Sequence, residues 1–314
     1  MKPRLGISAC LLGRTVRWDG GHKRDVYLTE MLAPWVDWVP VCPEVELGLG
    51  VPREPIHLVR DGATSRLVAT RTGRDLTARM RRLARSRIAQ LARENLSGFV
   101  VKKDSPSCGM ERVRVHRAAG PTRRDGRGMF TRVLMERMPL LPVEEEGRLH
   151  DGRLRENFIE RVFAYDRWRR FARSRPTVRR LVELHTAHEF QLLAHDPAGH
   201  ARLGRLVARA KERPLPAVVA EYGTGIMGAL ARIATPGRHA NVLERLLGFF
   251  SGRLGPAERA EVVGVIADYR QRIVPLVVPL TLVKHHVRRL DIDYLARQTY
   301  LDPHPNELML RNHV

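Results

Sequence analysis

The sequence predicts an α/β N-terminal domain with a mostly parallel sheet and flanking helices, followed by an all-α C-terminal domain. Its 314 residues suffice for two cores, and 43% apolar residues indicate a globular chain. Short apolar runs alternate with helical patterns as far as about residue 150, and strand-like alternation is missing beyond it. We expect the boundary near residues 146–153, giving domains of residues 1–150 and 151–314.

In the first half, three short apolar runs predict buried strands at residues 5–10, 38–42 and 98–102. Helices are expected between and after them. Their ranges are 25–36, 77–95 with Thr77 as N-cap, and 129–137. The Gly- and Arg-rich segment 118–128 predicts a mobile loop.

The second half carries apolar residues at helical spacing from Phe158 onward. The expected helices after that first one cover residues 181–193, 203–210, 218–233, 242–247, 258–273 and 276–289.

The formal net charge is +21, and both halves contribute to it. Residues 1–150 hold 28 Lys and Arg against 17 Asp and Glu, and the remainder holds 27 against 17. Such a field favours polyanions, either nucleic acid or an anionic membrane surface. No apolar run approaches the roughly 18 residues of a membrane span, and the N-terminus resembles a buried strand more than a signal peptide. We therefore expect a cytoplasmic protein without a membrane partner.

The chain has three cysteines, and no two of them form a CxxC pair. Cys10 and Cys42 end the first two apolar runs, and Cys108 follows the third after one turn. Because the carboxyl ends of parallel strands share one edge, these thiols are expected to meet there. They suit zinc with a fourth ligand, for which His22 and His57 are candidates, or a cubane cluster with one open iron. Three buried structural cysteines are the simpler alternative.

Two polar residues flank the expected metal ligands. Glu44 comes two residues after Cys42, where Pro43 fixes the chain, and its carboxylate is suited to general acid–base work on water. Ser105 precedes Cys108 by three residues and offers a hydroxyl for positioning substrate or relaying a proton. Glu46 is the second choice of carboxylate.

The segment 16–23 follows the first cysteine and contains a Gly-Gly turn. Trp18 is expected to stack on a flat base and Asp19 to hydrogen-bond it, although a tight loop capped by Asp19 fits the pattern equally well. Lys102 and Lys103 leave the third strand toward the same edge and are candidate phosphate contacts.

Four segments carry a resemblance to a known family: ISACLLG, VRWDGGHKRD, VCPEVELGLGVPREP and KKDSPSCGM. They resemble the thiouracil desulfidase (TudS) family. The segments VPLVVPLTLVKHHVRR and YLARQTYLDPHPNELMLRN resemble a YbgA-like helical domain. The whole chain resembles the two-domain form of that family, the tRNA 4-thiouridine desulfidases (RudS).

The resemblance implies that Cys10, Cys42 and Cys108 bind a 4Fe-4S cluster and that Glu44 and Ser105 are catalytic. It implies hydrolytic removal of sulfur from 4-thiouridine in tRNA, which yields uridine and sulfide. Basic residues within the helices of the second half are the candidate RNA contacts. They are Arg167, Arg169, Arg170, Lys284, Arg288 and Arg289.

Two other functions fit the residues. One is a desulfidase of free thiouracil or thionucleosides, with the helical domain serving dimerisation or regulation. The other is a non-catalytic nucleic-acid-binding protein in which the metal site is structural.

Overall fold

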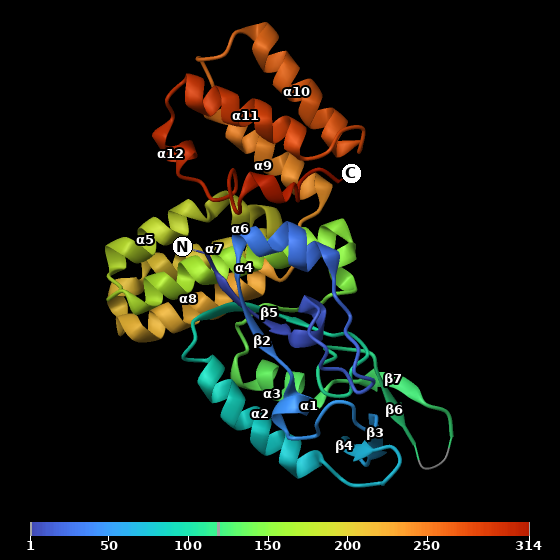
Figure 1. The fold of residues 1–314 in the computed structure, drawn as a ribbon. Helices are drawn as coiled ribbons and strands as arrows, with labels where there is room; N and C mark the ends of the chain where they lie inside the picture. Colours follow the sequence, from blue (N-terminus) through green and yellow to red (C-terminus); the bar gives the residue numbers. More distant parts are fainter. Residues whose placement is uncertain (1, 118–119, 314) are drawn as a thin grey trace. The chain divides into compact units, whose positions relative to one another are not determined.

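A computed structural model describes residues 2–117 and 120–313, and the chain divides into two compact units. One unit ends at Asp151 and the other begins at Gly152 (Figure 1). Each has its own core and is described separately. Within the described residues, no helix is both long and apolar enough to cross a membrane.

The first unit is built on a four-stranded parallel sheet. Its strands are β1 (Arg4–Ser8), β2 (Asp37–Val41), β5 (Leu96–Val101) and β8 (Val143–Glu145), in the order β2-β1-β5-β8. Every residue of β5 is buried, as expected for a strand covered on both faces. The chain turns to β2 on one side of β1 and then returns to β5 on the other side, so the strand order reverses beside β1. The predicted parallel α/β core is confirmed.

Two of the expected helices of this unit form as α-helices, namely α2 (Thr77–Leu91) and α3 (Met129–Arg137). Helix α2 buries Met80, Ala84, Ile88 and Leu91, which recur three or four residues apart and form one apolar face. Thr77 is its first helical residue and not its N-cap, because Leu76 occupies the cap position and Asp75 accepts a hydrogen bond from the Thr77 N–H (2.8 Å). Residues 27–32 form a π-helix, and the 3₁₀ turn Ala33–Trp35 follows it. Pro34 lies in the first turn of that 3₁₀ helix, where its missing N–H costs no helical hydrogen bond.

A second four-stranded sheet was not predicted. It comprises β3 (Ile56–Asp61), β4 (Thr64–Ala69), β6 (Val113–His116) and β7 (Arg123–Gly126), in the order β4-β3-β6-β7. The expected mobile loop 118–128 is therefore wrong in part, because residues 123–126 pair with β6 as an antiparallel strand. Residues 118–119 of that expected loop lie outside the described residues.

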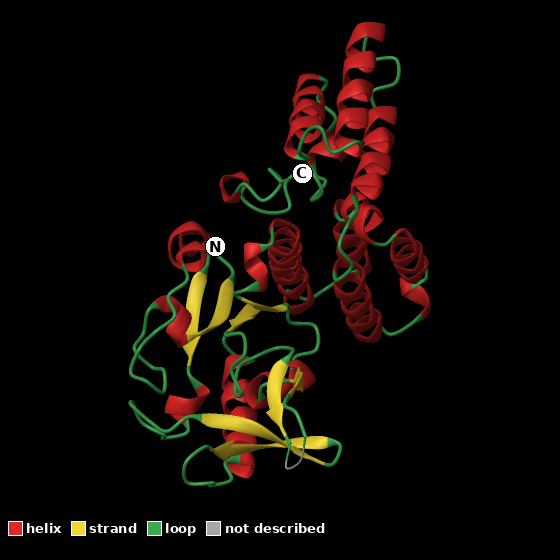
Figure 2. Cartoon of the chain, turned by 90° about the vertical axis from the view of Figure 1, so that its right-hand side faces the viewer, coloured by secondary structure: helices red, strands yellow, loops and turns green. Residues whose placement is uncertain are grey.

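The second unit is helical throughout its described residues, and the strands drawn in yellow in Figure 2 all belong to the first unit. The predicted all-α domain is confirmed. Its helices are α4 (Gly152–Arg173), α5 (Val178–Ala187), α6 (Glu189–His195), α7 (Pro197–Ala208), α8 (Leu215–Leu230), α9 (Pro236–Gly248), α10 (Pro256–Arg270), α11 (Val277–Arg289) and α12 (Asp293–Ala296). Leu243, Val262, Val283 and Tyr300 share a core that joins α9, α10, α11 and the segment after α12.

Candidate active site

The three cysteines line one cavity of about 430 Å³ in the first unit. Cys10 lies in the 3₁₀ turn that follows β1, and Cys42 caps the short helix α1 (Pro43–Glu46) that follows β2. Cys108 lies in the turn after β5. The sheet thus brings together thiols that are up to 98 residues apart in the sequence, at the edge where the strand order reverses.

Burial keeps these thiols protonated while no cation compensates them. Burial, and next the neighbouring Cys42, raise the pKa of Cys10 to about 11. Burial also raises the pKa of Cys42. Burial, and next the negative charge of Glu44, raise the pKa of Cys108 well above its ordinary value. Three thiolates in one buried cavity need positive charge among them, which the core of an iron–sulfur cluster provides. The residues present therefore fit such a cluster.

A single metal ion fits less well. Within residues 2–117 and 120–313, no three His, Cys, Asp or Glu side chains come close enough together to hold one ion. A cubane spreads its ligands over separate irons, so its cysteines lie farther apart than the ligands of one zinc. His22 and His57 do not line the cavity: His22 accepts a hydrogen bond from the Arg24 N–H, and His57 packs against His116.

Glu44 lines the cavity on α1 and is held at both oxygens. Arg53 donates to Glu44 Oε2 through Nη2 (2.7 Å) and Nε (3.1 Å), and the Ser107 hydroxyl donates to Oε1 (2.9 Å). The Arg53 side chain is 5% exposed, so the ion pair is largely shielded from water. Arg53 also donates to the Val16 and Gly50 carbonyls (2.9 Å each). The carboxylate therefore faces the cavity in one fixed orientation.

Glu46 lies on the same helix but faces another way. It accepts a hydrogen bond from the Cys42 N–H (3.3 Å) and pairs with Arg87 on α2 (3.3 Å). It is absent from the residues that line the cavity. Of the two candidate carboxylates, Glu44 lines the cavity and Glu46 does not.

Ser105 shapes the turn that carries Cys108. Its Oγ accepts hydrogen bonds from the N–H groups of Cys108 (3.1 Å) and Ser107 (3.3 Å), which leaves its hydroxyl hydrogen free to donate into the cavity. Ser8, at the end of β1, accepts from the Lys102 N–H (3.0 Å) and lies against Cys108. Sequence reasoning missed Ser8, Arg53 and Ser107.

The remaining predicted substrate contacts are divided. Trp18, Lys102 and Lys103 line the cavity, and Lys102 is ion-paired with Glu146. Asp19 does not line it: its Oδ1 accepts from the Gly21 N–H (3.0 Å), which is the turn-capping alternative. The predicted substrate role of these four residues stays a prediction.

The three predicted RNA contacts on α4 all have partners within the second unit. Arg167 is largely buried and donates to the Pro303 carbonyl (2.7 Å), so it is poorly placed to reach a polyanion. Arg169 and Arg170 both pair with Asp166, and only Arg170 is exposed.

The predicted contacts on α11 differ from one another. Lys284 pairs with Asp302, and Arg289 pairs with Glu258. Arg288 is exposed and forms no ion pair with any residue that the structure describes. Lys284 and Arg288 line the same cavity of about 250 Å³. Of the predicted set, this pair is the best placed for an anion.

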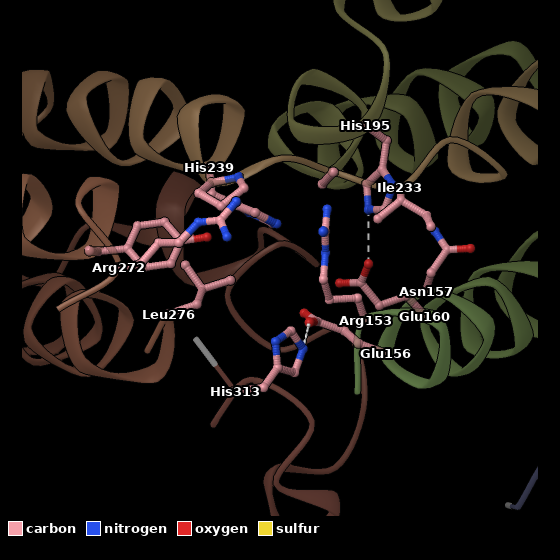
Figure 3. Close-up of a pocket in the computed structure, with 13 residues that line it drawn as sticks. Arg153, Glu156, Asn157, Glu160, His195, Ile233, His239, Arg272, Leu276 and His313 are labelled. Carbon is pink, nitrogen blue, oxygen red and sulfur yellow. Dashed lines mark hydrogen bonds and ion pairs between the residues drawn. The ribbon is translucent and has the colours of Figure 1, made fainter. Parts of the chain in front are cut away.

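The second unit also holds an ionic cluster around Arg311, and its members Glu156, Glu160, His195 and His313 line a narrow pocket of about 50 Å³ (Figure 3). Arg311 donates to Glu160 (2.7 Å) and Glu156 (3.2 Å), and His195 and His313 each contact one of these carboxylates at 2.8 Å. The other ring nitrogen of His195 lies 2.6 Å from the Arg232 carbonyl. Since both nitrogens face acceptors, His195 is an imidazolium, and the pairing with Glu160 raises its pKa against the effect of burial.

The first unit matches a known family. The family described as 2-thiouracil desulfurase matches residues 5–146. The uncharacterized protein YbbK of Bacillus subtilis (strain 168) is 31% identical over 112 residues, which cover 33% of this chain and 71% of YbbK. This chain belongs to the 2-thiouracil desulfurase family.

Three further similarities accompany this match. A solved structure of the 4Fe-4S-dependent thiouracil desulfidase TudS is 32% identical and covers 48% of this chain and 94% of that one, with a TM-score of 0.40. The family DUF1722, of unknown function, matches residues 190–305. The uncharacterized protein YbgA of Escherichia coli (strain K12) is 27% identical over 161 residues, which cover 51% of this chain and 95% of YbgA. In this desulfurase-family chain, the cavity described above is the candidate active site.

Proposed function

We propose that this desulfurase-family protein is a 4Fe-4S-dependent desulfidase that removes sulfur from 4-thiouridine in tRNA, giving uridine and sulfide. The observation that carries the proposal is the cavity at the carboxyl edge of the parallel sheet. It holds all three cysteines of the chain together with a positioned carboxylate, Glu44.

Cys10, Cys42 and Cys108 would hold the cluster, and their burial in one cavity supports this assignment. When bound through three protein ligands, the cluster supplies an open iron, a Lewis acid with affinity for sulfur that polarises the carbon–sulfur bond. No redox partner is needed, because the net reaction exchanges sulfur for the oxygen of water. The products are a carbonyl and hydrogen sulfide.

Glu44 is the group suited to activate that water. Its carboxylate accepts a proton as the water oxygen bonds to the thiocarbonyl carbon, and the sulfur departs with the protons that water supplied. Arg53 and Ser107 are positioning residues, because their hydrogen bonds hold the Glu44 carboxylate. The free hydroxyl hydrogen of Ser105 is suited to a carbonyl of the base or to the departing sulfur.

The charge distribution supports a polymeric substrate. Lys23, Lys103 and Arg114 line the cavity beside Lys102 and Arg53, against Glu44 and Asp104 as its acids. The free base carries no phosphate that would use these cations, whereas a nucleotide within tRNA does. The formal charge of +21 supports the same class of partner.

Free thiouracil or a thionucleoside is the second candidate substrate. The matching family is described by its action on 2-thiouracil. A cavity of about 430 Å³ also suits a small ligand without a polymer attached.

The test is an oxygen-free purification with iron and sulfide analysis, followed by incubation with tRNA that contains 4-thiouridine. About four irons per chain, loss of the thiobase and matching release of sulfide are expected. Turnover of free thiouracil alone would assign the second substrate, and zinc without sulfide release would leave a nucleic-acid-binding protein with a structural metal.

Glu44→Gln tests the role of the carboxylate. The amide keeps the shape but cannot accept the proton, so turnover should fall roughly 10²- to 10⁴-fold while iron content is retained. Glu46→Gln is the matched control on the same short helix and should stay near the wild-type rate. Equal losses in the two variants would contradict the assignment.

A further inference from the structure

A second cavity of the first unit, of about 450 Å³, is lined by arginines. It lies where α2, α3 and the β3–β4 hairpin meet, and α2 and α3 pack against each other (Figure 1). Arg81 and Arg85 come from α2, Arg132 and Arg137 come from α3, and Arg127 precedes α3. Glu136 is its one acidic lining residue. We call this cavity the arginine cleft.

These arginines differ from others on the same elements. On α2, Arg87 pairs with Glu46 and Glu94, and Arg79 donates to the Leu47 carbonyl (3.1 Å). Arg81 and Arg85 form no ion pair or hydrogen bond of their side chains with any part of the chain that the structure describes, and both are exposed.

The arginines of α3 are unpaired as well among the described residues. Across residues 2–117 and 120–313, Arg132 and Arg137 likewise have no ion-pair partner. Arg127 donates to the Met110 carbonyl (2.9 Å) but meets no carboxylate among those residues. The cleft therefore concentrates five positive charges against the single carboxylate of Glu136.

The chemistry of the cleft matches phosphate. Guanidinium groups bind phosphate oxygens through paired N–H donors, and a concave basic surface concentrates anions. Arg81 and Arg85 are four residues apart on one helix, where like charges repel each other, so a bound anion would relieve that repulsion. Five cations, four of them on two helices, suit a row of phosphates better than a single small anion.

We propose that the arginine cleft binds the phosphodiester backbone of the RNA substrate. The inference rests on the proposed function and extends it. It places polymer recognition on a surface of the first unit outside the active-site cavity. The sequence predicted phosphate contacts only at Lys102 and Lys103 in that unit and placed the other RNA contacts in the helical half. Arg81, Arg85 and Arg132 are the residues that carry it.

The cleft shares α3 with the cysteine-bearing turn. The N–H groups of Met129 and Phe130 donate to the carbonyls of Pro106 and Ser107 (3.0 Å each), and the Thr131 hydroxyl donates to the Cys108 carbonyl. One helix therefore fixes Cys108 at its first turn and presents Arg132 at the next position. A backbone held in the cleft has a fixed position relative to the active-site cavity, as a polymeric substrate requires.

The test compares an Arg85→Ala/Arg132→Ala double variant with wild type on 4-thiouridine-containing tRNA and on the free nucleoside 4-thiouridine. Alanine is the best helix former, so both helices are retained. KM for tRNA should rise roughly tenfold, and the slope of log affinity against log salt should fall by roughly 1 to 2. Turnover of the free nucleoside should stay within about twofold, which reports an intact fold and cluster.

Arg82→Ala is the matched control, because Arg82 lies on α2, is exposed and does not line the cleft. It removes one charge from the same helix and should leave both substrates nearly unaffected. An Arg85→Lys/Arg132→Lys variant keeps the charge but loses the paired donors. Its KM for tRNA should therefore lie between those of wild type and the double alanine variant.

Three results would overturn the inference: unchanged KM and salt dependence for tRNA in the double variant, equal losses in Arg82→Ala, or weaker binding of anionic vesicles with tRNA turnover unaffected. If wild type turns over the free nucleoside but not tRNA, the proposed tRNA substrate fails instead. In that case the affinity of the protein for tRNA, measured directly, tests the arginine cleft. Weaker binding by the double variant supports the inference, and unchanged binding overturns it.

Discussion

Both units contain a buried cluster of titratable side chains, but the two clusters differ in what the protein leaves open. In the helical unit, Glu156, Glu160, His195 and Arg311 satisfy one another through ion pairs and hydrogen bonds. In the desulfurase unit, the Cys42 thiol makes a long contact of 3.8 Å with the Val16 carbonyl, and the three thiols face a cavity of about 430 Å³. Buried charge alone therefore does not mark a site. A site is marked by side chains, such as the three thiols, whose ligand atoms face a cavity.

The largest effect is expected from removing one thiol. Cys108→Ala should abolish sulfide release and lower iron to background, because two cysteines cannot hold the cluster and the chain has no fourth. Iron analysis, visible absorption and sulfide assays measure this. Far-UV circular dichroism of the helices should be retained. Full iron content in this variant would remove Cys108 from the ligand set.

Substitutions in the ionic cluster of the helical unit should lower the stability of the protein and leave its turnover unchanged. Arg311→Met leaves Glu156 and Glu160 without their shared cation, and breaking such a buried pair costs about 3–5 kcal/mol in the free energy of unfolding. Chemical denaturation followed by circular dichroism measures the loss, while turnover of free thiobase by the folded protein should persist. Arg297→Met breaks an exposed pair with Asp293 and should change little. Equal effects of the two substitutions would contradict a structural role for the cluster.

The smallest expected effect is a loss of stability in acid. Burial, and next the nearby Arg167, lower the pKa of His188 to about 4, and burial lowers that of His239 to about 3, from an ordinary 6.5. Between pH 6.5 and these values the unfolded chain binds more protons, so stability falls as pH falls. The raised pKa of His195 acts in the opposite sense.

The contribution of His188 is on the order of 3 kcal/mol when fully expressed. Melting temperatures of the helical unit from neutral pH downward would check this. His188→Asn keeps a donor for the Leu184 carbonyl and should flatten the profile. A profile as steep as that of wild type would contradict the assignment.

The sequence predicted the convergence of the cysteines because it depends on local rules. Apolar runs locate the strands, and parallel strands end at one edge, so Cys10, Cys42 and Cys108 follow from position alone. The support of Glu44 did not follow. Arg53 is 9 residues from Glu44 in the chain and Ser107 is 63 residues from it. Their contacts with one carboxylate depend on tertiary structure, which the sequence pattern does not show.

The missed second sheet had a readable signal. Gly62-Ala63 is the two-residue turn between β3 and β4, and Gly62 has a positive φ of 55°, as such hairpin turns require at their first position. The ion pairs of Arg311 had no such signal, because they link residues more than 150 positions apart. Patterns predict elements, whereas pairing between distant elements depends on tertiary packing.

The contacts of Arg53 have a consequence for redesigning the enzyme. One guanidinium joins the carbonyl of Val16, in the segment expected to meet the base, to the carboxylate expected to activate water. A designer who reshapes residues 16–18 for a bulkier thiobase would therefore also disturb Glu44. Lys23 and Lys103 line the same cavity without contacting Glu44 or Arg53. Substrate range is more safely altered at these lysines.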